Sequence, residues 1–292
     1  MDYSTLDDAI IAVGLRVIVR VDGEEEEQRF FVKLIEQEEW LGMAEAEYEG
    51  AKALAACIPD NVVAPVAWGK LNKNKFKSFF MTRFLNLDAQ SPSILPLLAI
   101  LKRLHETSVS PTGKFGFHVT TYFGPPPMIN NWTDNWEHFF SRQWYADLAE
   151  VQKVHGEDTE LQTLGEEFCE KVIARLLRPL QTGGRNIKPT LCHGDLWDGN
   201  VHVDVHTKES ILFDPVCFYG HNEMDLQCMG SPRYALGMDF IELYKDEVGA
   251  SEPRDDFYDR HKLYALCKSQ MRELLRKFPN GYDGFVDEKA DE

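Results

Sequence analysis

The sequence is poor in paired cysteines and in long apolar segments. Its 292 residues include six cysteines, and no two of them form a CxxC pair, so neither a zinc site nor a disulfide framework is expected. Scattered thiols of this kind fit a reducing compartment. The longest apolar run, residues 94–101, is far too short to span a bilayer, and the polar residues 1–8 do not read as a signal peptide. These absences predict a cytoplasmic protein without a membrane partner.

Basic residues are also scarce. There are 31 Lys and Arg against 48 Asp and Glu, which gives a net charge of −17. Such a surface argues against binding to nucleic acid or anionic membranes. It would also repel free phosphates, so a phosphate ligand would need local cations or a metal ion. The hydrophobic content of 43% is enough for one large domain or two lobes.

Residues 1–85 are expected to form a small, mostly β unit with one helix. Asp22-Gly23 is a strong hairpin signal between two strand-like segments, and the Glu run that follows it is most simply a solvated turn. The Ala- and Glu-rich residues 43–57 predict a helix. Strands are predicted at residues 15–23, 28–35, 61–71 and 77–85.

Residues 86–292 have a mainly helical pattern. A helix is expected over residues 93–107, with Ser91 or Ser93 as its N-cap. The tail from residue 280 has no apolar period and is expected to fray. The fold class is therefore α+β, with a small β-rich lobe over 1–85 and a larger helical lobe over 86–292. Further helices are predicted at 133–154, 159–180 and from about 225 to 277, with short strands at 200–205 and 210–214.

The segment "HGDLWDGN", residues 193–200, stands out chemically. Asp195 and Asn200 are five residues apart, in a loop that precedes the predicted strand pair. A β-hairpin brings its ends together, so Asn200 at its start and Asp214 at its end should be neighbours. Oxygen ligands of this kind suit Mg²⁺ with substrate phosphates completing its shell. Protein kinases use the same spacing, which predicts Asp195 as the catalytic base and Asn200 and Asp214 as metal ligands.

Two details favour a kinase of small molecules over a protein kinase. Gly194 stands where protein kinases have an arginine that receives an activation-loop phosphate, so no such switch is expected. Pro215 follows Asp214 in place of Phe-Gly, and proline restricts the backbone beside the metal-binding side chain.

The amino-terminal part should supply a cation for the nucleotide phosphates. Lys33 lies in a predicted strand among apolar residues, where a charge is costly unless it is paired. Glu47 shares a helical stripe with apolar residues and is the expected partner, with Glu45 and Glu49 as competitors. A surface lysine and a solvated glutamate are the alternative. The segment that joins the two parts would then pair with adenine, through Met81, Thr82, Arg83 and Phe84; an ordinary edge strand is the alternative.

Four segments together resemble the fructosamine/ketosamine-3-kinases, within the aminoglycoside-phosphotransferase-like group of the protein-kinase-like fold. They are "GKFGFHVTTYFG" (113–124), "NWTDNWEHFFSRQ" (131–143), "HGDLWDGN" (193–200) and "FDPVCFYGHNEMDL" (213–226). The resemblance implies ATP- and Mg²⁺-dependent phosphorylation of the sugar 3-hydroxyl of a free or protein-bound ketosamine. It also implies that His193 braces the loop and that Trp197, His221, Glu223 and Asp225 lie near the substrate. Trp197 could instead pack in the core, and Asp225 could cap a helix or brace a loop.

One feature departs from the family pattern. The family has a Gly/Ser-rich phosphate loop between its first two strands, whereas Gly14 is the only glycine before residue 23 here. Either the first strand and loop are shortened, or residues 4–14 replace the loop. Phosphorylation of a ketosamine therefore has two alternatives: a kinase of another small hydroxyl substrate, such as an aminoglycoside or choline, and a non-catalytic binding protein.

Overall fold

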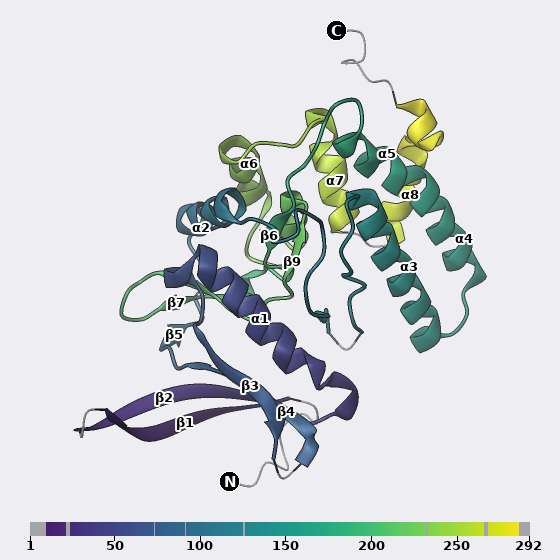
Figure 1. Ribbon diagram of the computed structural model, residues 1–292. Helices are drawn as coiled ribbons and strands as arrows, with labels where there is room; N and C mark the ends of the chain where they lie inside the picture. The colour runs from purple at the N-terminus through teal and green to yellow at the C-terminus, as the bar shows by residue number, and fades with distance from the viewer. Residues whose placement is uncertain are drawn as a thin grey trace.

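A four-stranded antiparallel sheet forms one end of the molecule (Figure 1). The computed structural model describes residues 10–21, 24–72, 74–90, 92–124, 126–231, 233–265 and 268–285. The strand order is β1-β2-β4-β3, so the central strands carry Lys33 and the segment that leaves toward the helices. The strands are β1 (Ile10–Val21), β2 (Glu24–Ile35), β3 (Pro65–Leu71) and β4 (Asn74–Arg83).

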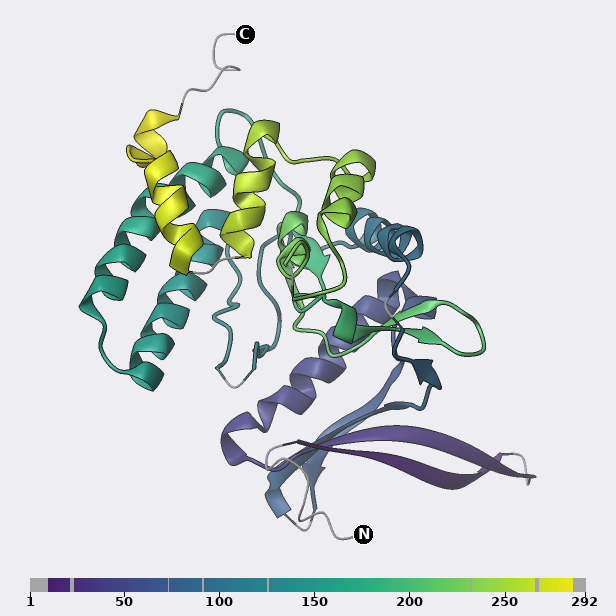
Figure 2. The same cartoon turned by 180° about the vertical axis from the view of Figure 1, so that it is seen from behind.

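Helix α1 (Gly42–Cys57) lies between this sheet and the rest of the molecule, as both views show (Figures 1 and 2). Its apolar stripe includes the buried residues Ala44 and Ala51, which pack with Ile35 and Phe80 of the sheet. Ala-rich sequence gives a narrow helix surface that can approach the strands closely. The charged side chain on the same stripe, Glu47, is consequently buried as well.

The larger part of the molecule is helical, as predicted. Its core is rich in aromatic rings: Trp136 is fully buried and stacks on Phe139 and Phe218, with centroids 5.1 and 6.5 Å away. A π-helical turn, Cys169–Ile173, joins α4 to α5 without a break. The helices are α2 (Ile94–Thr107), α3 (Trp136–His155), α4 (Thr159–Phe168), α5 (Ala174–Leu177), α6 (Met238–Glu247), α7 (Phe257–Tyr264) and α8 (Lys268–Lys277).

Two small sheets lie between the large sheet and the helices. The predicted hairpin is present, and a hydrogen bond from Val63 N–H to the Leu212 carbonyl (3.2 Å) attaches it to the amino-terminal part. The second small sheet pairs the strand before residue 193 with the strand after residue 217. These strands are β5 (Leu87–Asp88), β7 (Val201–Asp204), β8 (Ser210–Leu212), β6 (Thr190–Cys192) and β9 (Phe218–Gly220).

The Glu run is not a turn, contrary to the prediction. Residues 24–27 are the first residues of β2 and pair with residues 18–21 of β1, from Val21 opposite Glu24 onward. A two-residue connection is sufficient for a hairpin, so the strand can begin immediately after it. The predicted turn residues Asp22 and Gly23 lie outside the described residues, as do residues 1–9.

The expectation that the tail frays is also wrong for its first residues. Tyr282 and Phe285 stack on the guanidinium groups of Arg178 and Arg175, at 4.8 and 4.7 Å from ring centroid to guanidinium carbon. No helix within the described ranges is long and apolar enough to cross a bilayer. The α+β, two-lobed fold class agrees with the structure, while the lobe boundary at residues 85 and 86 stays a prediction.

Candidate active site

The segment 193–200 forms the loop between β6 and β7. Asp195 is half-buried, and the side-chain amide of Asn200 donates to its backbone carbonyl (2.8 Å) and to its Oδ2 (2.9 Å). Burial raises the pKa of the Asp195 carboxyl, and His193 and Asn200 oppose that rise. The sequence spacing of five residues therefore produces direct contact, with Asn200 fixing the orientation of the Asp195 carboxylate.

Gly194 has a steric reason to be glycine. Its φ is +83°, and a Cβ atom at this position would lie 2.1 Å from the Val216 carbonyl oxygen. The segment between β8 and β9, which contains Val216, passes so close to the loop that no side chain fits. The arginine of protein kinases is therefore excluded here by the backbone geometry.

The hairpin places Asp214 beside this loop, as the sequence predicted. The Phe213 N–H donates to the Asn200 carbonyl at 3.1 Å, one residue before Asp214. Asp214 has a φ of +53°, an uncommon conformation for a residue other than glycine, and it is followed by Pro215. The Asp214 side chain is 49% exposed, so its carboxylate is accessible to a ligand.

Lys33 reaches both partners from the sheet. Its ammonium forms an ion pair with Glu47 of α1 and lies 3.4 Å from Oδ1 of Asp214. Burial by itself would lower the pKa of Lys33, but the carboxylates of Glu47 and Asp214 raise it above its ordinary value. Glu49, one of the competitors, contacts His118 and Lys52 instead. The structure thus brings Lys33, Glu47 and Asp214 together.

A cavity of about 140 Å³ lies between these groups. Lys33, Glu47, Asp195 and Asp214 all line it, so the sheet, α1 and both loops contribute. Tyr122 also lines it, from the segment 108–135 between α2 and α3. Sequence reasoning did not single out Tyr122, although it lies within one of the four segments that carried the family resemblance.

A second cavity of about 350 Å³ adjoins the first, and the two share Asp214 and Pro215. Of the four residues predicted to face adenine, Thr82, Arg83 and Phe84 line it and Met81 does not. Strand β4 alternates its side chains, which turns Met81 away. Thr82 Oγ1 is buried against this cavity without a hydrogen-bond partner among the described residues.

The backbone hydrogen bonds of residues 83–85 limit which N–H group could pair with adenine. The N–H groups of Arg83 and Phe84 already donate to the carbonyls of Ala64 (3.2 Å) and Arg29 (3.1 Å). The next residue, Leu85, also lines the cavity. Within the described chain its backbone N–H has no such partner. A ligand that pairs with the backbone here would therefore find its donor at Leu85, one residue beyond the predicted range.

Asp225 supports the loop from behind, which was the alternative role considered for it. Its Oδ2 accepts from the His193 N–H (2.9 Å) and its Oδ1 from the Gly194 N–H (2.8 Å). The Asp225 side chain is completely buried. The expectation that Asp225 faces the substrate is therefore wrong, because both of its oxygens are used inside the protein.

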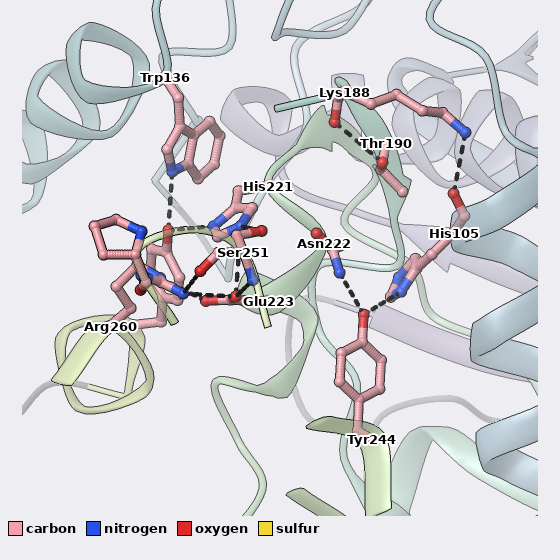
Figure 3. A network of polar contacts seen from close by, with 12 residues as sticks. His105, Trp136, Lys188, Thr190, His221, Asn222, Glu223, Tyr244, Ser251 and Arg260 are labelled. Atoms are coloured by element: carbon pink, nitrogen blue, oxygen red, sulfur yellow. Dashed lines mark hydrogen bonds and ion pairs between the residues drawn. The ribbon is translucent and has the colours of Figure 1, made fainter. Parts of the chain in front are cut away.

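His221 and Glu223 are also buried, in a polar network next to the aromatic core (Figure 3). Glu223 forms a two-pronged ion pair with Arg260 of α7, at 2.7 and 2.8 Å. His221 contacts the hydroxyls of Tyr264 and Ser251, each at 2.8 Å. The substrate prediction does not fit these positions, since neither side chain reaches the surface.

Trp197 is the exception among the four predicted substrate residues. It is half-buried and lies over Gly199, with its ring 5.3 Å from the Tyr234 ring. Trp197 remains a candidate for contact with a sugar. Asp198, in contrast, accepts a hydrogen bond from the Ala235 N–H (3.1 Å) and stabilises the loop.

The side-chain oxygens of Asp214 and Asn200 suit a hard cation such as Mg²⁺ only when a bound phosphate supplies further oxygen ligands. Within the described ranges, no group of three or more His, Cys, Asp and Glu side chains is placed to hold a metal ion. Asp214 and Asn200 would provide one carboxylate and one amide oxygen. Magnesium in nucleotide sites is held in this way, by one or two protein oxygens with phosphate oxygens and water. The residues present therefore fit a cation that arrives with a phosphate ligand.

The arrangement is that of the protein-kinase-like fold. A crystal structure described as a fructosamine-3-kinase from Haemophilus somnus 129PT superposes with a TM-score of 0.63 at 20% identity, covering 94% of this chain and 88% of the other. A ternary complex of the aminoglycoside phosphotransferase APH(4)-Ia with AMP-PNP and hygromycin B superposes with a TM-score of 0.55 at 12% identity, covering 98% and 87%.

A match to a family model over most of the chain shows the family. The family described as "Fructosamine kinase" matches residues 13–283, so the chain belongs to that family. The chloroplastic protein-ribulosamine 3-kinase of Oryza sativa subsp. japonica is 30% identical over 227 residues. That match covers 77% of this chain and 61% of the rice protein.

Proposed function

We propose that this protein is an ATP-dependent kinase that phosphorylates the sugar 3-hydroxyl of ketosamines, the adducts of a sugar with an amine. The observation that carries the proposal is the convergence of Lys33, Glu47, Asp195 and Asp214 on one cavity beside a larger, mostly apolar one. The family supports the acceptor, because fructosamine and ribulosamine are both ketosamines. The orphaned Thr82 Oγ1 supports a ligand in the larger cavity.

Each group has a role that follows from its position. Asp195 accepts a hydrogen bond from the acceptor hydroxyl and takes its proton as the new oxygen–phosphorus bond forms and the bond between the γ-phosphorus and the ADP leaving group breaks. Lys33, held by Glu47, neutralises the nucleotide phosphates. Asp214 and Asn200 would hold Mg²⁺, which supplies further charge neutralisation on the phosphates. Phosphoryl transfer depends mainly on positioning and on such neutralisation.

The same geometry favours an enzyme over a non-catalytic binding protein. A protein that only binds a ligand has no need for a half-buried carboxylate whose orientation is fixed by a side-chain amide.

The proposed nucleotide position uses Thr82, Arg83, Phe84 and Leu85 around adenine. The proposed location is the cytoplasm, in agreement with the free thiols of the five cysteines that the structure describes.

The test is an assay with Mg-ATP and ribulosyl- or fructosyl-lysine, with the phosphorylated position read by ³¹P and ¹³C NMR. Asp195→Asn should lower kcat by about 10²- to 10⁴-fold, the usual contribution of a general base. Asp198→Asn is the matched control, because it removes a carboxylate from the same loop without touching the cavity, and it should retain activity. Undiminished turnover by Asp195→Asn, or phosphorylation of aminoglycosides but not of ketosamines, would contradict the proposal.

A further inference from the structure

A groove leads away from the catalytic loop on the helical side. It consists of two adjoining cavities of about 180 and 510 Å³. Gly194 lines the smaller one, and Gln227 ties the groove to the loop by donating to the Gly194 carbonyl at 2.5 Å. The groove therefore begins one residue from the proposed base. The two cavities share Phe123, Gln143, Asp147, Met224 and Gln227.

The walls of the groove are largely apolar. They come from the segment 108–135, from Met224 and Gln227, and from helices α3, α4, α7 and α8. These four helices are grouped at one side of the molecule (Figure 1). Exposed apolar side chains at its edge include Phe123 (50%) and Val151 (42%). A polar ligand would gain little from such walls, whereas methylene groups would be covered by them. The larger cavity is lined by Trp144, Leu148, Val151, Leu161, Leu263 and Met271, among others.

Asp147 is the only charged side chain among the described residues that line the groove. It lies on the exposed face of α3, and its Oδ1 accepts from Gln143 Nε2 at 2.6 Å, one turn earlier. Because Asp147 lines both cavities, it lies where the catalytic end of the groove meets the apolar end. A single carboxylate between a reaction centre and an apolar channel is complementary to a cation on an aliphatic chain.

We infer that this groove binds the amine part of the substrate, with the ammonium at Asp147 and the aliphatic stem along the larger cavity. The inference rests on the proposed function, in which the sugar hydroxyl lies at Asp195. The nitrogen of a ketosamine is a basic secondary amine that carries a proton at neutral pH. On lysine adducts it is followed by four methylene groups, which the apolar walls would cover. Asp147 thus selects amine-linked sugars over neutral ones.

The test compares two substrates that differ only at this nitrogen: fructosyl-hexylamine and the ether in which oxygen replaces the nitrogen. Asp147→Asn should raise KM for the amine about fivefold with little change in kcat, the effect of one partly exposed ion pair, and leave the ether unaffected. Glu150→Gln is the matched control. Glu150 is on the same helix, but its carboxylate pairs with Lys153 outside the groove. Its replacement should therefore leave KM unchanged for both substrates.

A second variant tests the stem independently. Val151→Trp would fill the open edge of the larger cavity and should raise KM for fructosyl-hexylamine but not for fructosyl-methylamine, whose stem ends before that point. Equal effects of Asp147→Asn on the amine and the ether, or no effect on either, would overturn the groove assignment while leaving the kinase proposal standing. Failure of the unaltered protein to phosphorylate any ketosamine would overturn the proposed function, and the groove assignment with it.

Discussion

At the scale of single residues, Lys33 shows most clearly how neighbouring groups set the charge of a side chain. The Lys33 side chain is 14% exposed, and its ammonium lies between Glu47 of the following helix and Asp214, which is 181 residues away in the sequence. Two carboxylates keep it protonated in a site that would otherwise favour the neutral amine. A permanent cation here counteracts, locally, the net charge of −17 that would repel a nucleotide.

Replacing this lysine should therefore impair catalysis. Lys33→Ala should lower kcat/KM for Mg-ATP by about 10²- to 10³-fold, because a charge that faces the transferred phosphate is lost. Steady-state kinetics would measure the loss. Lys77→Ala is a suitable control, since Lys77 pairs with Glu36 at a partly exposed site on the same sheet. Unchanged kcat/KM in Lys33→Ala would mean that this lysine does not face the nucleotide.

At the scale of elements, the ion pair between Glu223 and Arg260 fastens the turn Asn222–Leu226 to helix α7 (Figure 3). Both side chains are almost completely buried, and Arg260 also donates to the carbonyls of Ser251 and Pro253 at 2.8 Å. Arginine lowers the pKa of Glu223 against the effect of burial. The same turn carries Asp225, so this attachment also holds the support of the catalytic loop.

Breaking that pair should be strongly destabilising. Arg260→Ala leaves the Glu223 carboxylate buried without a cation, and we expect a loss of about 3–5 kcal/mol in the free energy of unfolding. Lys262→Ala provides the comparison. Lys262 is also on α7, but it pairs at the surface with Glu273 of α8, and its loss should cost less than about 1 kcal/mol. Urea denaturation would measure both. Similar small losses in the two variants would show that the buried pair adds little.

At the scale of the whole molecule, buried histidines make stability depend on pH. Burial lowers the pKa of His221 to about 4, against an ordinary value of 6.5, and it also lowers the pKa of His193. Between about pH 4 and 6.5, His221 binds a proton in the unfolded chain but not in the folded chain. Stability is therefore complete above about pH 6.5 and falls as the pH drops toward 4.

We expect His221 alone to contribute about 3 kcal/mol to this loss. The free energy of unfolding, measured in urea between pH 7 and 4, should decrease steadily. His221→Gln should flatten the profile in this range, whereas His155→Gln, which changes an exposed histidine, should not. An identical slope in His221→Gln and the unaltered protein would show that His221 titrates normally in the folded state.

Much of the local structure could be read from the sequence. The Ala-rich residues 43–57 form α1 almost as predicted, and the hairpin brings Asn200 and Asp214 to the same place. Periodicity, turn residues and fixed spacing are local properties, so they can be interpreted without knowledge of the fold. The Glu run shows the limit of this reading, because pairing with β1 overrides its polar composition.

The sequence by itself determined the candidate base and metal ligands, Asp195, Asn200 and Asp214, because a loop and a hairpin bring them together over a short stretch of chain. Only the tertiary structure decided that Glu47 is the residue that meets Lys33. It also decided that Glu223 is buried against Arg260, 37 residues further along. Whether a charged side chain faces a ligand or the core depends on a partner from a distant element, and neither spacing nor composition encodes that partner.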